Sequence, residues 1–344
     1  MKNTFHIFNF IAILGFSSAT FAQDIHFSQF YQTPLIINPS LTGVFNGDQR
    51  ACLNYRNQWN DFAPFTTSSI SFDSKIFERK MKNKHLGAGL NINRDFAGDS
   101  KLSTTQFQAS LASTIEIGKG QNISAGIQGG FTQRAMDGAL KWGSQYDGYG
   151  FDPTKSGETG YFENYTFGDF SAGISWNFGK SETNVSSADY LGASAGVAIL
   201  HINAPKQGID LDKLNQVLVV HGNAVIGMKG KRIALIPSLL YMQQGPLKEI
   251  TTGAMVRLTI RKESKYTGFM KAVSAYLGSY YRFGDAVVPS CMFEVANYCL
   301  GFSYDANTSK LKEATNGKGA FEISLRFINP DPFKHKGYNH RALM

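Results

Sequence analysis

The chain has 344 residues, of which 17% are charged and 13% aromatic, and its formal net charge is +8 at pH 7. Its basic residues are spread along the chain, a pattern that argues against nucleic acid as a partner and supports only a weak bias towards anionic lipid or an acidic protein. Its three cysteines, Cys52, Cys291 and Cys299, are too few for a disulfide framework.

Residues 1–22 have the composition of a signal peptide. Lys2 supplies a positive start, an apolar run extends from Phe8 to Phe16, and Thr20-Phe21-Ala22 places small residues where a signal peptidase reads them. The run is too short for a membrane-spanning helix, and no later stretch reaches about 18 uninterrupted apolar residues. We therefore expect a secreted chain whose mature N-terminus is Gln23.

Residues 23–48 precede the repeating pattern of the chain. They contain Pro34 and Pro39 and show no clear period, which predicts an irregular segment. Two placements are open: inside a barrel as a plug, or at its periplasmic mouth.

From residue 49 to residue 328, apolar and polar side chains alternate. After Thr166, for example, Phe170, Ile174 and Trp176 fall on one face and Asp169 falls on the other. A period of two indicates strands with unlike faces. The chain contains about fourteen such segments, at residues 49–58, 66–74, 84–94, 101–116, 121–135, 166–178, 189–201, 217–228, 231–242, 247–260, 269–283, 285–295, 297–306 and 317–328.

Such segments throughout a secreted chain predict an all-β fold, a transmembrane up-and-down antiparallel β-barrel with lipid outside and polar contents inside. The mean hydropathy of −0.20 does not oppose this, since only alternate residues of a barrel face lipid. The expected domains are a signal peptide (1–22), an N-terminal segment (23–48), an outer-membrane barrel (49–328) and a periplasmic tail (329–344). An even number of strands places the N- and C-termini on the same, periplasmic side.

The links between the segments support this orientation. Gly118 to Gln121, Lys229-Gly230 and Val295-Ala296 are tight and fall at periplasmic positions, whereas the longest links, 136–165 and 202–216, fall on the extracellular side. Two other periplasmic links, Lys75 to Asn83 and Gly179 to Ala188, are longer than this rule prefers, but the reverse orientation fits less well. The first long link is rich in aromatic residues, which dominate many protein interfaces. Two interpretations are equally open, a partner-binding loop or a loop packed on the rim or into the lumen. The candidate residues are Trp142, Tyr146, Tyr149, Phe151, Tyr161 and Phe162.

Glycines and prolines inside the segments carry further information. Six glycines within the segments are expected to relieve crowding on the inner wall and to let a plug or loop approach closely. They are Gly87, Gly89, Gly126, Gly129, Gly192 and Gly196. Pro237 and Pro289 predict bulges or interrupted strand pairing.

A catalytic function finds little support. Gly192-Ala193-Ser194-Ala195-Gly196 matches the G-x-S-x-G nucleophile pattern, but that chemistry needs a sharp turn after the serine, and here the alternation continues without one. Nothing shows that His201 or His221 reaches Ser194. No phosphate-binding loop, dinucleotide fingerprint or H-E-x-x-H motif appears, so we expect no enzyme, no cofactor and no metal.

Several motifs resemble those of the PorP/SprF family. They are Gln23-Asp24-Ile25-His26-Phe27-Ser28-Gln29-Phe30, then Pro34, Asn38-Pro39, Leu41-Thr42-Gly43, Tyr55-Arg56-Asn57-Gln58-Trp59, Pro64-Phe65-Thr66-Thr67, Ser71-Phe72-Asp73, Ser303-Tyr304-Asp305 and Gly319-Ala320-Phe321-Glu322-Ile323-Ser324-Leu325. The resemblance runs from Gln23 to Phe327 and is weakest in the middle.

The resemblance implies an outer-membrane barrel of the type IX secretion system of Bacteroidota. It further implies, as partners, a secreted cargo with a C-terminal sorting domain, such as a gliding adhesin, and other components of the secretion system. The expected function is therefore to bind, help export or anchor such a cargo. A porin-like passive solute channel is the alternative.

The expected faces also predict a stability effect. Leu325→Arg would place a charge on the lipid face and cost about 2–4 kcal/mol near the membrane midplane. The inward change Ser324→Arg should cost much less.

Overall fold

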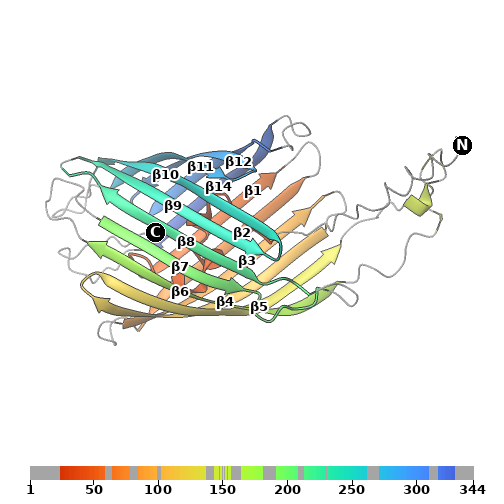
Figure 1. Cartoon of the computed structure of the whole chain (residues 1–344), viewed down its shortest axis with the longest axis horizontal. Coiled ribbons are helices and arrows are strands. Elements are labelled where there is room, and N and C mark those ends of the chain that lie inside the picture. Colours follow the sequence, from red (N-terminus) through yellow and green to blue (C-terminus); the bar gives the residue numbers. More distant parts are fainter. Residues whose placement is uncertain are drawn as a thin grey trace, which may run out of the picture.

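The computed structural model describes residues 24–58, 64–77, 84–98, 102–136, 143–146, 148, 150, 152, 154–155, 164–180, 191–207, 213–229, 231–261, 271–309 and 317–329. Within them, fourteen antiparallel strands form a closed barrel in which β1 pairs with both β2 and β14 (Figure 1). The strands are β1 (Gln49–Gln58), β2 (Phe65–Ile76), β3 (Lys84–Ala97), β4 (Leu102–Gly118), β5 (Gln121–Met136), β6 (Tyr165–Lys180), β7 (Leu191–Leu200), β8 (Val217–Gly227), β9 (Ile233–Gln244), β10 (Leu247–Arg261), β11 (Val273–Arg282), β12 (Ala286–Val295), β13 (Tyr298–Asn307) and β14 (Lys318–Asn329).

The predicted barrel and its number of strands are confirmed. The largest difference in a strand boundary is at β11, which begins at Val273 rather than at residue 269. Pairing is interrupted beside both prolines. β8 and β9 are paired at Asn223–Ser238 and again at Ile226–Leu235, with Pro237 in the gap. A similar gap between β12 and β13 contains Pro289, because proline has no N–H to donate to a neighbouring strand.

The outer face of the barrel is apolar along its length. Phe170, Ile174 and Trp176 of β6 are exposed, as are Phe321 and Leu325 of β14. Exposed apolar side chains in this arrangement are those of a barrel that faces lipid. In the described part of the chain, no helix is long and apolar enough to cross a membrane.

The inner face is polar on one side only, which corrects the expectation of wholly polar contents. Strands β1 to β6 point buried serine, threonine, asparagine and glutamine side chains inwards. Strands β8 to β12 instead point apolar side chains inwards, and these form a buried cluster that includes Val219, Ile236, Met255, Tyr280 and Met292. The two walls can differ because the lumen is filled by a segment of the polypeptide and not by water.

The two ends of the barrel differ in their links. We call the end at which β1 begins and β14 ends the turn end. The two-residue links 119–120 and 296–297 lie there, while a third two-residue link, 245–246, lies at the opposite end. The opposite end, where residues 137–164 and 201–216 connect strands, is the loop end. Both long links therefore fall at one end, as the sequence predicts.

Candidate functional site

Residues 24–48, the luminal segment, lie inside the barrel (Figure 1). The segment contains the short helices η1 (Phe30–Gln32), α2 (Pro34–Ile37) and η2 (Pro39–Leu41). Proline at the first position of α2 and of η2 fits the helix start, where its missing N–H is not needed. The Asn38 side chain caps η2 by accepting a hydrogen bond from the backbone N–H of Ser40. Local sequence therefore explains why this segment folds as a chain of single turns.

The luminal segment crosses the lumen from one end to the other. At the loop end, the backbone N–H of Asp24 donates to Oε1 of Gln244, the last residue of β9. At the turn end, the backbone N–H of Asp48 donates to the carbonyl of Asn329, the last residue of β14. The chain ends themselves lie outside the described residues. An even number of strands predicts that the two termini lie on the same side of the membrane. Asp24 and Asn329, the first and last described residues, lie instead at opposite ends of the barrel.

A histidine between two carboxylates holds the segment at the loop end. His201 directly follows β7, and its Nε2 lies 2.7 Å from Oδ2 of Asp24 while its Nδ1 lies 2.9 Å from Oδ2 of Asp169. Burial alone would lower the pKa of His201, but the two carboxylates outweigh burial and raise it to about 10. Burial alone would raise the pKa of Asp24, and the charge and hydrogen bond of His201 reverse this and lower it.

Closer to the middle of the barrel, a group of four charged side chains binds the luminal segment at Ser28 and Gln29. We call Arg56, Arg282, Asp305 and Glu322 the charged clamp. The two carboxylate oxygens of Glu322 accept the backbone N–H groups of Ser28, at 2.6 Å, and of Gln29, at 2.9 Å. The Ser28 hydroxyl donates to Asp305 at 2.8 Å and accepts from Arg56 at 2.7 Å and from Arg282.

The charged clamp is also tied together within itself. Arg56 pairs with Glu322 and, at 3.1 Å, with Asp305, and Arg282 pairs with Asp305 at 3.1 Å. All four side chains are buried. Buried charges are costly unless paired, and within a membrane protein they mark functional positions. The clamp comes from β1, β11, β13 and β14, so it joins the luminal segment to both sides of the barrel closure.

Near the middle of the lumen, the segment rests against four glycines that we call the glycine cradle: Gly87, Gly126, Gly173 and Gly196. A Cβ atom at Gly126 would lie 2.5 Å from the backbone of Pro39, and one at Gly87 would lie 2.7 Å from the carbonyl carbon of Thr42. Side chains at these positions would therefore push the segment off the wall. The predicted close approach is confirmed at Gly87, Gly89 and Gly126, and at Gly196, where the neighbours are the Asn38 and His221 side chains. It is wrong for Gly129, which lies on the outer face beside Phe170.

Apolar contacts secure the segment on the opposite wall. Phe30 packs edge-on against Tyr280, and Tyr31 stacks on the same ring with centroids 5.5 Å apart. Phe30, Tyr31 and Ile37 belong to the buried cluster of strands β7 to β13. Burial of such side chains supplies roughly 1.5–3 kcal/mol each before entropy is counted. The segment is therefore part of the hydrophobic core of the barrel.

A second ion pair anchors the segment at the turn end. Arg50 and Asp73 form a two-point contact, with Nε at 2.9 Å and Nη2 at 2.8 Å from the carboxylate oxygens. Asp73 also accepts the backbone N–H of Gly43, and Arg50 donates to the carbonyl of Leu41. The luminal segment is thus bound by charges at both ends and by packing between them.

The lumen of the described barrel is filled. Inward side chains on the polar wall, such as Asn91, Ser124 and Ser175, are buried, as are Val219 and Met292 on the apolar wall. In a water-filled channel these side chains would be exposed. Among the described residues, no group of three or more histidine, cysteine or acidic side chains is placed to hold a metal ion.

Only one of the six predicted partner-binding residues can be placed. Tyr146 follows the short helix η3 (Gly143–Gln145), is exposed, and its hydroxyl donates to the carbonyl of Gly148 at 3.3 Å. Trp142, Tyr149, Phe151, Tyr161 and Phe162 lie outside the described residues. A partner-binding role for this loop therefore stays a prediction.

Ser194, the centre of the G-x-S-x-G match, lies within β7. Its hydroxyl donates to Oδ1 of Asn177 at 2.8 Å. His221 contacts Asn38 of the luminal segment through Nε2 at 3.1 Å. Both residues thus take part in packing the lumen.

Sequence reasoning did not identify the charged clamp as a site. A signal was present, since Glu322 and Arg326 are charges that alternate with the lipid-facing Phe321, Ile323, Leu325 and Phe327. A charge at an inward position of a barrel strand needs a partner in the lumen. The partner could not be assigned, because the pairing of Glu322 with Ser28 joins residues at opposite ends of the chain.

The family of the protein follows from a match over most of its length. A model of the family described as "Type IX secretion system membrane protein PorP/SprF" matches residues 19–327. The chain belongs to the PorP/SprF family. The match covers the luminal segment and almost the whole barrel, so the resemblance read from the motifs is confirmed. Among curated proteins, no sequence matches the chain.

Solved structures similar to this member of the PorP/SprF family include three with very low sequence identity. CdiB from Acinetobacter baumannii is 7% identical, with a TM-score of 0.41 and coverage of 81% of this chain and 60% of its own. The CymD monoaromatic hydrocarbon channel is 8% identical (TM-score 0.44, 87% and 93% covered). A mutant of the TodX monoaromatic hydrocarbon channel is 9% identical (TM-score 0.45, 86% and 93% covered). The chain spans less than two thirds of CdiB, and similarities at this level carry no functional argument.

Proposed function

We propose that this protein is a non-enzymatic outer-membrane barrel of the type IX secretion system that binds, helps export or anchors a secreted cargo, such as a gliding adhesin, through the cargo's C-terminal sorting domain. Membership of the PorP/SprF family supports the system and the membrane. The observation that carries the non-channel role is the lumen filled by residues 24–48, which are held by buried ion pairs at Ser28 and at Gly43. A barrel closed in this way offers its rim and loops to a partner.

Deletion of the chain tests the cargo role. We expect one large surface adhesin to disappear from the cell surface while other type IX cargo is still secreted, measured by surface labelling and mass spectrometry of the culture medium. Loss of all type IX cargo would instead indicate a core component of the machinery. Unchanged display of every cargo would contradict the proposal.

The aromatic loop is the proposed contact with the cargo. A chain in which Trp142, Tyr146 and Tyr149 are replaced by alanine should insert normally but bring down less cargo from detergent-solubilised membranes. Lys213→Ala, an exposed residue of the other long link, is the matched control. Equal recovery of cargo by both variants would remove the loop from the interface.

The loop end is proposed to face the outside of the cell, because long links of outer-membrane barrels are extracellular and short turns periplasmic. The exposed residues Lys206 at the loop end and Lys231 at the turn end allow a test. In intact cells, a membrane-impermeant maleimide should label Lys206→Cys and leave Lys231→Cys unlabelled. The reverse labelling would invert the orientation. The proposed orientation also places Asp24 at the outer face of the membrane.

The alternative function is a passive solute channel. The buried inner wall opposes it, since an ion or solute would have to displace the luminal segment. In planar bilayers we expect no steady conductance from the intact protein. Large, steady currents would favour the channel.

A further inference from the structure

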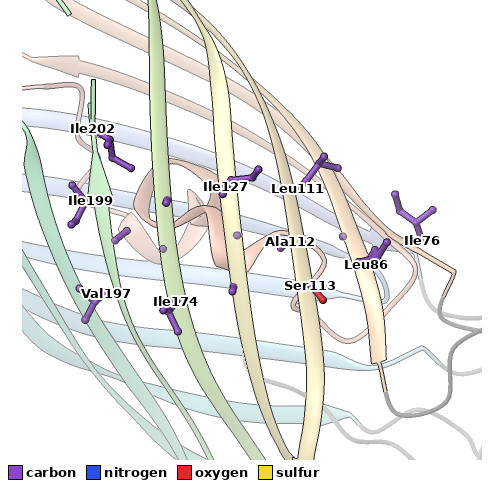
Figure 2. Close-up of a pocket in the computed structure, with 16 residues that line it drawn as sticks. Ile76, Leu86, Leu111, Ala112, Ser113, Ile127, Ile174, Val197, Ile199 and Ile202 are labelled. Atoms are coloured by element: carbon purple, nitrogen blue, oxygen red, sulfur yellow. The ribbon is translucent and has the colours of Figure 1, made fainter. Parts of the chain in front are cut away.

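The lipid-facing surface of the barrel is hollowed over strands β3 to β7. A furrow of about 690 Å³ crosses the outside of these strands, and Figure 2 shows its side chains in front of the helical turns of the luminal segment. Its lining is apolar apart from Ser113. Most of the outer surface carries large apolar side chains, so this hollow is a local feature.

Strand register explains the shape of the furrow. One row of paired outward residues runs across the strands as Leu86, Ser113, Ala125, Ile174 and Val197. The next row runs as Ala88, Leu111, Ile127, Ala172 and Ile199. In the first row, the small residues Ser113 and Ala125 lie between large ones. In the second row, the small residue among the inner three is Ala172, so the line of small residues steps from Ser113 and Ala125 on β4 and β5 to Ala172 on β6.

The wall beneath the furrow is thin, because its inward positions are also small. Gly87, Gly126 and Gly173 of the glycine cradle lie there, together with Ala112 and Ala198. The luminal segment contacts the inner side of this wall at Pro39 and Thr42. The same small residues that admit the segment from inside therefore leave a depression outside.

Length and charge describe what would fit the furrow. With strands about 4.8 Å apart, the row from Leu86 to Val197 is about 20 Å long, and because barrel strands tilt by about 35–45°, it runs obliquely across the apolar band of about 25 Å. At its turn end, Lys84 lies two residues before Leu86 on the same outward face, and Lys119 lies in the adjoining β4–β5 turn. Both lysines are exposed. The apolar furrow thus has two positive charges beside its turn end, and such charges attract anionic lipid headgroups.

A strand of another protein is a poor occupant. Strands β3 to β7 are each paired on both sides, so the wall has no free edge to which a strand could add. A polypeptide within the hydrocarbon region of a membrane must satisfy its backbone N–H and C=O groups internally. A fatty-acyl chain has no such groups to satisfy.

We propose that the furrow is a binding site for an anionic phospholipid, with one fatty-acyl chain along Ser113, Ala125 and Ala172 and the phosphate at Lys84 and Lys119. The lipid would stiffen the wall against which the luminal segment rests. This site is separate from the cargo role, and its test needs no cargo.

Trp176 provides a reporter for the test. The chain has three tryptophans, and Trp176 lies two residues beyond Ile174 on the lipid face, so Trp59→Phe and Trp142→Phe leave it as the single fluorophore. The protein is reconstituted in phosphatidylcholine vesicles containing a small fraction of brominated phosphatidylglycerol or brominated phosphatidylcholine. We expect the anionic lipid to quench Trp176 at a several-fold lower fraction than the zwitterionic one.

Two variants separate the parts of the site. Lys84→Gln and Lys119→Gln should each reduce the preference for phosphatidylglycerol about fivefold. Filling the furrow by Ala125→Phe with Ala172→Phe should remove the preference, and Ala172→Leu is a milder replacement if that pair does not fold. Ala254→Phe on β10 and Lys231→Gln at the turn end are controls and should change nothing, with folding checked by heat-modifiable migration on gels.

Three results would overturn the proposal. The first is equal quenching of Trp176 by both brominated lipids. The second is a preference that survives filling of the furrow. The third is protection of Trp176 from both lipids together with a protein crosslinked at Ala172→Cys, which would identify a protein as the occupant.

Discussion

The luminal segment is held by charge at Ser28 and Gln29 and by shape at residues 38–43. The charged clamp uses directed hydrogen bonds from Glu322 and Asp305, and it works only while both signs of charge are present. The glycine cradle uses the absence of side chains, and it works at any protonation state. The first device selects a particular peptide position, whereas the second only requires that the chain be narrow.

The two devices should therefore fail in different ways. Removing one member of a buried ionic group leaves its partners charged and unpaired, which is strongly destabilising. Adding atoms to the cradle instead creates a steric conflict that the neighbouring backbone can relieve in part. The larger loss of stability is therefore expected at the clamp.

Glu322→Gln should give the largest loss of stability. It removes the charge that pairs with Arg56 and one of the acceptors for Ser28 and Gln29, and breaking a buried pair typically costs about 3–5 kcal/mol. The free energy of unfolding in detergent micelles, from urea titration, measures the cost. Glu116→Gln, at an exposed position of β4, is the control and should change it by less than about 0.5 kcal/mol. Similar losses for both variants would show that the clamp does not hold the segment.

Leu325→Arg tests the outer face of the strand that carries Glu322. Leu325 is exposed to lipid, and an arginine there should cost about 2–4 kcal/mol if the residue lies near the midplane. Val295→Arg, at the turn end of β12, should cost about 0–1 kcal/mol because it lies near the interface. Equal costs in the urea titration would mean that the membrane band is placed wrongly along the strands.

The structure changes the expectation for Ser324→Arg. From alternation alone, an inward arginine next to Leu325 should be mild. Ser324 is instead buried, and its hydroxyl donates to Oε1 of Gln29 at 2.7 Å. An arginine would have to displace the luminal segment, so it does not serve as a mild control.

Gly126→Ala should disturb the cradle by a smaller amount. The added Cβ would lie 2.5 Å from the backbone of Pro39, and overpacking of this kind costs about 1–3 kcal/mol. Gly168→Ala on β6 is the matched control, because the nearest atom to its Cβ would be 3.9 Å away. Limited proteolysis of the luminal segment, compared with the urea midpoint, would show whether the segment loosens before the barrel. If Gly126→Ala behaves like Gly168→Ala, the segment has room to move.

Much of the barrel could be predicted from sequence, because its information is local. Alternation of period two gives the strands and their faces, so β1 is predicted at its observed bounds and Phe170 and Asp169 are assigned to the correct sides. The family motifs cover both the luminal segment and the last strand. The glycines at 87, 126 and 196 also indicated close approach by a plug or loop.

The candidate site could be predicted only in part, because it depends on contacts between distant residues. Nothing in residues 23–48 shows that Ser28 meets Glu322 of the last strand, or that Asp24 lies at the loop end. Val219 and Met255 are apolar side chains at inward positions, where the alternation of a barrel predicts polar ones. Their presence is explained by Phe30 and Tyr31, which belong to the same buried cluster. Which segment fills a lumen depends on how the shapes and charges of distant residues fit together. No periodic pattern in the sequence records that fit.

His201 gives the most selective test, at the loop-end contact with Asp24. Its pKa rises from 6.5 to about 10 on folding, so its stabilisation is complete below about pH 6.5 and is lost as the pH rises through about 10. His201→Asn removes the titration and keeps a residue that tolerates the positive φ of 54° at this position. The free energy of unfolding of the parent protein should therefore fall more steeply than that of the variant between pH 7 and pH 10. Parallel curves would mean that the two carboxylates do not hold His201 charged.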